Sequence, residues 1–259
     1  MLILRVVIEC TDTKVKTHKE RIDLGRCSKD DIERIMGNAS HLNNPGERIG
    51  FISQHFLNTP YQESTLTGNI DTQEAFVINL GGVDCFTFID YVETMRLSGS
   101  FDEFKENLKK VRYQSGVVDY RKRNHFFTDW AEFGRSNIRD VTGGIGGNRT
   151  IKAKKILNTK EDGTCLLQGI APREREIAYI PADSIDPPVL AAMKTGDYAG
   201  IYSELPGLDV SHAGIIIKAD DNEIFLRHAS SLEKYRKVTD QPLKDYLSGK
   251  PGLIVLRAV

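Results

Sequence analysis

The sequence predicts an α+β fold in which helices come first and an antiparallel β-sheet follows. Apolar residues recur at helical spacing up to about residue 113, and short β-type runs separated by polar turns begin at about residue 177. We expect one domain over residues 1–259, with a mainly helical part (1–57), an insertion that lines a functional site (114–176) and a sheet core (177–259).

The composition argues against several classes of protein. Lys and Arg number 35 and Asp and Glu number 36, so the net charge of -1 gives no electrostatic reason to expect nucleic acid or an anionic membrane as a partner. The four cysteines form no C-x-x-C pair, which argues against zinc fingers and disulfide-dense miniproteins. We expect no nucleic-acid partner, no membrane insertion and a monomer.

The chain begins with an apolar segment, MLILRVVIEC, interrupted by Arg5. It has no basic stretch before the apolar run and no small-residue cleavage site, so we interpret it as a β-strand rather than a signal peptide. It is also too short to span a bilayer. The expected location is periplasmic or secreted if a signal peptide was removed, and cytoplasmic otherwise.

Three segments of the first half have helical patterns, and Ser28 can cap the first of them. TPYQESTLTG (59–68) breaks the pattern with a proline and a glycine and predicts a loop. The three helices are expected over residues 28–42, 46–58 and 101–113.

The last third of the chain predicts strands. HAGIIIK and EIFLRHA flank the polar segment ADDN (219–222) and predict a β-hairpin. Counting outward from the centre of that turn places His212 almost opposite His228, within one residue of register, with both side chains on one face of the sheet. Further strands are expected over residues 177–181, 196–204 and 252–259.

A histidine pair on neighbouring strands has three possible roles. Hydrogen-bonded structural histidines are common in strands. A metal site would need a third ligand such as His125 or Asp129, and no residue at ligand spacing supplies one locally. The third role is a catalytic base with a partner that orients it, and the sequence leaves the choice open.

Cys85 opens a helix in the segment GGVDCFTFIDYV. Phe88, Ile89 and Val92 form the apolar face of this helix, and Asp84 can cap its first turn. A thiol at a helix N-terminus lies near free backbone N–H groups, which lower its pKa and can hold an oxyanion. A buried structural cysteine is the alternative. Combined with a downstream histidine pair on a sheet, Cys85 has the layout that a papain-like hydrolase needs.

These motifs resemble those of a known family. GGVDCFTFIDYV, VSHAGIII and LRHASS are similar to the Cys, His and third-residue motifs of the NlpC-like cysteine amidases and peptidases of bacterial cell walls. TPYQESTL, YRKRNHFFTDW, IAYIPA and LDVSHAGI are similar to one branch, the N-acetylmuramoyl-L-alanine amidase-like family first described as a domain of unknown function. The resemblance implies a papain-like fold, with a nucleophile helix on an antiparallel sheet or barrel. It also implies hydrolysis, without a metal or cofactor, of the amide between N-acetylmuramic acid and L-alanine in peptidoglycan fragments.

The resemblance also implies roles for individual residues. Cys85 is the expected nucleophile, His212 the general base and His228 the residue that orients the base. Tyr61 is expected at the oxyanion site, and Asp84 is expected to contact the peptide part of the substrate. The other expected substrate-binding residues are Asn124, His125, Asp129, Trp130, Ser211 and Ser230.

Several alternatives stay open. Asp84 can serve only as a helix cap, Tyr61 can belong to a packed turn, and Trp130 can be a core residue. The same catalytic residues could instead serve an endopeptidase that cleaves a γ-D-glutamyl–diamino acid bond. A glycopeptide-binding module with an inert thiol is a function of a different class.

Overall fold

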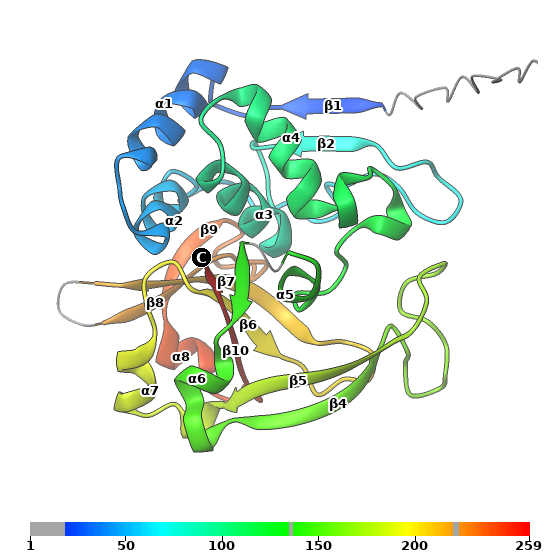
Figure 1. The fold of residues 1–259 in the computed structure, drawn as a ribbon, viewed down its shortest axis with the longest axis vertical. Coiled ribbons are helices and arrows are strands. Elements are labelled where there is room, and N and C mark those ends of the chain that lie inside the picture. Colours follow the sequence, from blue (N-terminus) through cyan, green and yellow to red (C-terminus); the bar gives the residue numbers. More distant parts are fainter. Residues whose placement is uncertain (1–18, 135–136, 220–222) are drawn as a thin grey trace, which may run out of the picture.

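The computed structural model describes residues 19–134, 137–219 and 223–259, and the strand expected over residues 1–10 lies outside them, as does most of the turn expected at 219–222. The long helices lie on one side of the molecule and the large sheet lies on the other (Figure 1). This arrangement confirms the predicted α+β fold, with helices first and an antiparallel sheet after them. The long helices are α1 (Lys29–Ser40), α2 (Pro45–Gln54), α3 (Cys85–Arg96) and α4 (Phe101–Arg112).

The helices begin at side chains that satisfy their first free N–H groups. Ser28 caps α1 and exchanges hydrogen bonds with Asp31, which forms a capping box. Asn44 caps α2, Asp84 caps α3 and Ser100 caps α4. The three predicted helices are therefore confirmed, although α2 ends a few residues before the predicted limit.

Within the described residues, the large sheet has eight strands in the order β4-β5-β10-β6-β7-β8-β9, with β3 also paired to β10. All of its pairs are antiparallel. The strands are β3 (Ile138–Asp140), β4 (Ile151–Leu157), β5 (Arg173–Pro181), β6 (Tyr198–Tyr202), β7 (Val210–Lys218), β8 (Ile224–Ala229), β9 (Val238–Pro242) and β10 (Gly252–Ala258).

The sheet begins earlier in the sequence than we expected, because β3, β4 and the start of β5 come from the stretch 114–176. β4 is an edge strand with lysines at several positions, a composition that protects exposed edges and also hides the apolar pattern of a strand. A second, parallel pair joins β1 (Glu20–Asp23) to β2 (Phe76–Asn79), and its strands are too short to leave a clear signal.

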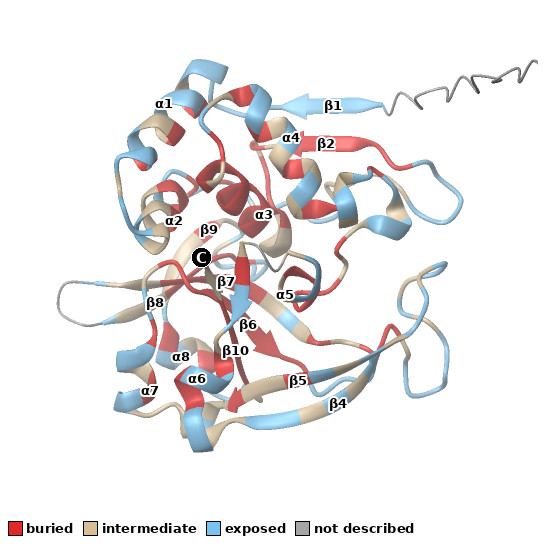
Figure 2. Ribbon diagram, in the orientation of Figure 1, coloured by how far each residue is buried: buried red, intermediate tan, exposed pale blue. Residues whose placement is uncertain are grey.

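Apolar side chains cover both faces of the large sheet. Along β10, Ile254 and Leu256 pack toward the long helices, whereas Leu253 and Val255 pack into a second cluster on the opposite face. α3 is buried at the centre of the molecule (Figure 2). The described residues include no helix with the length and hydropathy of a membrane span. The short helices are α5 (Asp129–Phe133), α6 (Thr142–Gly146), α7 (Pro187–Ala192) and α8 (Leu243–Leu247).

Candidate active site

Cys85 is the first residue of α3, and α3 packs against β7. Asp84 Oδ1 accepts hydrogen bonds from the N–H groups of Phe86 and Thr87 at 3.0 and 2.7 Å. The cap therefore satisfies the second and third N–H groups of the helix. The cap does not engage the N–H of Cys85 itself, which faces the Cys85 sulfur at the open end of the helix.

The N–H groups at the helix start lower the pKa of Cys85 as expected, but two other influences act in the opposite direction. Burial and the carboxylate of Asp84 raise the pKa of the thiol to about 12. The N–H groups of Ala213 and Phe86 face the sulfur and oppose this rise, but they do not outweigh it. Asp84 thus caps the helix and at the same time counteracts the field of the helix N-terminus, so the resting site holds a neutral thiol.

The two histidines share one face of the sheet, as predicted, but they are not directly opposite each other. Ile216 pairs with Leu226, and this register places Gly214 opposite His228. The paired residues of β7 and β8 have numbers that average 221, whereas His212 and His228 average 220, so the two histidines are offset along the strands. His212 is the diagonal neighbour of His228, with ring centroids 4.8 Å apart and ring planes at 87°.

A β-bulge precedes His212. Ile201 pairs with His212 and Tyr202 pairs with Val210, so Ser211 is the extra residue on β7. Bulges re-aim neighbouring side chains and are common beside active sites. Here the bulge fixes the position of His212 near the start of β7.

A chain of hydrogen bonds runs across three strands from His212. His212 Nε2 lies 2.7 Å from His228 Nδ1, and His228 Nε2 lies 2.7 Å from Gln241 Oε1 on β9. Gln241 Nε2 donates to the hydroxyl of Tyr235 at 3.3 Å. In this chain His228 Nε2–H donates to Gln241 and His228 Nδ1 accepts from His212 Nε2–H. The lone pair of His212 is then on Nδ1, free to take a proton.

Burial keeps both imidazoles neutral. Burial, together with the neighbouring His228 and Lys250, lowers the pKa of His212 to about 3. Burial also lowers the pKa of His228, while its hydrogen bond to Gln241 opposes this shift. Both imidazoles are therefore favoured in the neutral form. The N–H of Ala213, the residue after His212, faces the Cys85 sulfur and brings this end of β7 to the thiol.

Two tyrosines lie near the thiol. The pKa of Tyr61 is raised by burial and by the nearby Cys85 and Asp84. Burial and Cys85 raise the pKa of Tyr246, on α8, to about 12. The ring of Tyr246 also contacts His212 and His228, with centroids 5.8 and 4.9 Å away. Cys85, Tyr61, Tyr246 and the two histidines therefore form one site.

The predicted residues of the insertion lie deeper in the protein. Asn124 is buried and donates to Val111 O at 2.9 Å. His125 Nε2 lies 2.8 Å from Tyr120 O, and burial lowers the pKa of His125 to about 4. These contacts occupy Asn124 Nδ2 and His125 Nε2, and a role for either residue in substrate binding remains a prediction.

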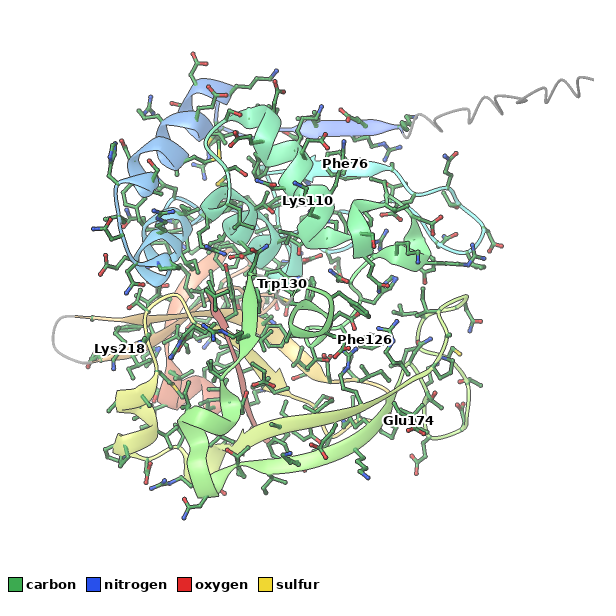
Figure 3. The ribbon with its side chains drawn as sticks, in the orientation of Figure 1. Phe76, Lys110, Phe126, Trp130, Glu174 and Lys218 are labelled. Carbon is green, nitrogen blue, oxygen red and sulfur yellow. The ribbon has the colours of Figure 1, made fainter. Side chains whose placement is uncertain are left out.

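Asp129 and Trp130 begin α5 and are both buried. Asp129 Oδ1 pairs with Arg175 at 2.8 Å and with Arg173 at 3.1 Å. Trp130 lies between the helices and the sheet (Figure 3), in edge-on contact with Phe86 at a centroid distance of 6.0 Å. Trp130 is therefore linked to the site through the residue that follows Cys85.

The two predicted serines differ in exposure. Ser211, the bulge residue, is exposed, whereas Ser230 is buried with no partner for its hydroxyl among the described residues. Two residues of the site, Gln241 and Tyr246, were not anticipated from the sequence. Successive side chains of a strand point to opposite faces, so the segment VTDQP could have indicated which face of the sheet carries Gln241. The contact of Tyr246 with the histidines had no local signal.

The described part of the chain contains no group of three or more His, Cys, Asp or Glu residues placed to hold a metal ion. The third ligands considered above are engaged elsewhere, since His125 contacts Tyr120 and Asp129 pairs with arginines. The histidine pair is therefore tied to Gln241 and to the tyrosines rather than to a ligand cluster.

Comparisons with known proteins agree with this picture. A crystal structure of a Legionella pneumophila protein assigned to DUF1460 is similar to 89% of this chain and 94% of that protein, with a TM-score of 0.75 and 24% identity. An N-acetylmuramoyl-L-alanine amidase from Bacteroides uniformis is similar over 83% of this chain and 99% of that one, with a TM-score of 0.69 and 28% identity. A Bacteroides fragilis protein described as a xylanase candidate covers 79% of this chain and 98% of its own length, with a TM-score of 0.66 and 31% identity.

A search of curated proteins found no match to this chain. The sequence profile of the N-acetylmuramoyl-L-alanine amidase-like family, AmiA-like, matches residues 51–253, which include Tyr61, Cys85, both histidines and Gln241. The chain belongs to the N-acetylmuramoyl-L-alanine amidase-like family.

Proposed function

We propose that this protein is a papain-like cysteine hydrolase that cleaves the amide between N-acetylmuramic acid and L-alanine in peptidoglycan fragments. The main support is the chain His212–His228–Gln241, which directs the Nδ1 lone pair of His212 away from the other histidine. Family membership favours a peptidoglycan-related substrate. The position of Cys85 at the start of α3, against β7, supplies the nucleophile.

The first half of the reaction makes a thioester. His212 Nδ1 takes the proton of the Cys85 thiol as the sulfur attacks the carbonyl carbon of the muramoyl amide. The N–H of Cys85 and the hydroxyl of Tyr61 donate hydrogen bonds to the oxyanion. His212 then gives its proton to the nitrogen of L-alanine, the C–N bond breaks, and the peptide leaves with a free amine.

The second half restores the enzyme. His212 takes a proton from a water molecule, whose oxygen attacks the thioester carbonyl. The C–S bond breaks, the sulfur regains the proton from His212, and N-acetylmuramic acid leaves as a carboxylic acid. Because burial disfavours both the thiolate and the imidazolium, we propose that proton transfer accompanies attack rather than preceding it.

The proposal is tested by digesting purified muropeptides and identifying the products by mass spectrometry. The expected products are a sugar without peptide and a peptide that begins with L-alanine. Cleavage between γ-D-glutamate and the diamino acid would indicate the endopeptidase instead.

The Cys85→Ala variant should release no peptide while it retains the melting temperature of the wild type. Cys27→Ala is the matched control, because Cys27 is an exposed free cysteine and its loss should leave hydrolysis unchanged. Full activity in Cys85→Ala would exclude the cysteine mechanism. Xylan serves as a second substrate, since one similar protein is described as a xylanase candidate, and we expect no reducing sugar from it.

A further inference from the structure

An exposed arginine lies at the edge of the candidate active site. Arg236 belongs to the connection between β8 and β9, and its guanidinium lies over the ring of Tyr61, 4.9 Å from the ring centroid. The other groups near the Tyr61 hydroxyl include Cys85 and Asp84, which raise its pKa. Tyr61 is therefore close both to the guanidinium of Arg236 and to Cys85.

The backbone of Arg236 is attached to the same tyrosine. Tyr61 N donates to Arg236 O at 2.9 Å, and the neighbouring Pro60 and Lys237 form a β-bridge. Arg236 has a φ of 45°, in the left-handed region where side chains other than Asn and Asp are uncommon. Strained backbone of this kind is held by its surroundings and concentrates at ligand-binding sites.

Among the described residues, no carboxylate forms an ion pair with Arg236. The two lysines of the same connection are engaged differently. Lys237 Nζ donates to Asn58 Oδ1 at 2.7 Å, and Lys234 lies over the ring of Tyr235. Arg236 is thus the basic residue of this connection that combines a free guanidinium with contact to the site.

The chemistry of the proposed substrate limits which anion can reach this arginine. The carboxyl of the sugar is consumed in the scissile amide, and the carboxyl of L-alanine is consumed in the next peptide bond. The following D-glutamate is linked through its γ-carboxyl, so its α-carboxylate is the first free anion. It lies about two residue lengths, roughly 7 Å, from the carbonyl under attack.

We infer that Arg236 binds this free α-carboxylate and makes it a determinant of specificity. The inference rests on the proposed function, because it takes its substrate from there. A planar guanidinium holds a carboxylate through paired hydrogen bonds, and it gains no comparable interaction from the carboxamide of D-isoglutamine. The cation–π contact with the ring of Tyr61 holds the guanidinium beside the proposed oxyanion site.

The test compares two synthetic ligands, N-acetylmuramoyl-L-alanyl-D-isoglutamate and N-acetylmuramoyl-L-alanyl-D-isoglutamine, which differ only in this group. Calorimetry on the Cys85→Ala variant measures binding without turnover. The acid should bind about tenfold more tightly than the amide. This difference in binding free energy lies between those typical of an exposed ion pair and of a charge-assisted hydrogen bond. The preference should weaken as salt is added.

Arg236→Asn, added to the Cys85→Ala variant, should bind both ligands equally and as weakly as the parent binds the amide. Asparagine is chosen because it removes the charge and adopts a positive φ more readily than other side chains. The matched control is Lys234→Gln, which removes a charge from the same connection and should keep the tenfold preference.

The inference is overturned if the parent binds the acid and the amide equally, if it binds neither, or if Arg236→Asn keeps the preference. Hydrolysis by the wild type is measured separately on both ligands. Absence of hydrolysis with a preserved binding preference would reject the proposed function and leave the carboxylate site standing. Hydrolysis of both ligands without a binding preference for the acid would support the proposed function and reject the carboxylate site.

Discussion

The two halves of the candidate active site are built in different ways. The thiol is held by one helix start, where Asp84, Cys85 and Thr87 lie within a few residues of each other. The base is held by β7, β8 and β9, whose side chains meet only because the strands adopt one register. Local geometry therefore fixes the proposed nucleophile, whereas long-range pairing fixes the proposed proton acceptor. We therefore expect the helix half to tolerate small changes elsewhere better than the sheet half does.

Removing the base tests the sheet half most directly. His212→Asn should lower kcat for muropeptide hydrolysis by about 10³-fold or more, because it removes the proposed acceptor of the thiol proton. Rates are measured by chromatography of the released peptide. His55→Asn, at the end of α2, is the control and should retain wild-type rates. A loss below tenfold in His212→Asn would mean that the base is a different residue.

Removing Gln241, the hydrogen-bond acceptor of His228, should have an intermediate effect. Gln241→Leu deprives His228 Nε2 of its acceptor, so His212 loses its preferred tautomer and kcat should fall roughly tenfold to hundredfold with little change in KM. Gln241→Glu retains an acceptor and should recover much of the rate. Equal losses in the two variants would point to a packing role for the glutamine.

The helix half is tested by changing one charge while keeping the cap. Asn is as good an N-cap as Asp, so Asp84→Asn should leave stability within about 1 kcal/mol of the wild type. It removes one of the groups that raise the pKa of Cys85, so alkylation of that thiol at pH 8 should become several-fold faster. Mass spectrometry of peptides from iodoacetamide-treated free enzyme follows Cys85 separately from the other cysteines. An unchanged rate would show that burial alone controls the thiol.

The smallest expected effect is on acid stability. The pKa of His212 is about 3 in the folded protein and close to the ordinary 6.5 when unfolded, so the unfolded chain binds the extra proton between these values. The contribution of His212 to stability is complete above about pH 6.5 and declines as the pH falls toward 3. Thermal melting across this range should show a shallower decline for His212→Asn than for the wild type. Parallel curves would contradict the buried, neutral state of the imidazole.

The contrast between the halves also explains which features the sequence revealed. Ser28 and Asp84 mark the starts of α1 and α3 because a cap acts within one helical turn. The α+β order and the shared face of His212 and His228 followed from periodicity. The diagonal placement of the two histidines did not, because a change of one residue in register shifts the partner of every residue along the hairpin.

Other features had no local signal. Gln241 joins the site because β9 pairs with β8, and Tyr246 joins it because α8 folds back over both histidines. The high pKa of Cys85 was missed for a different reason. The dipole of the helix could be anticipated from the sequence, but the depth of burial at its start depends on elements that follow far along the chain.

The packing of α3 against β7 has a consequence for biosynthesis. A ribosome makes Cys85 long before His212, His228 and Gln241, and domains of this kind fold only when the distant strands are present. A nascent chain that has formed α3 therefore carries a thiol without a base. The thiol therefore precedes the histidine pair in synthesis, and the central strand β10, which joins β5 to β6, is made last of all.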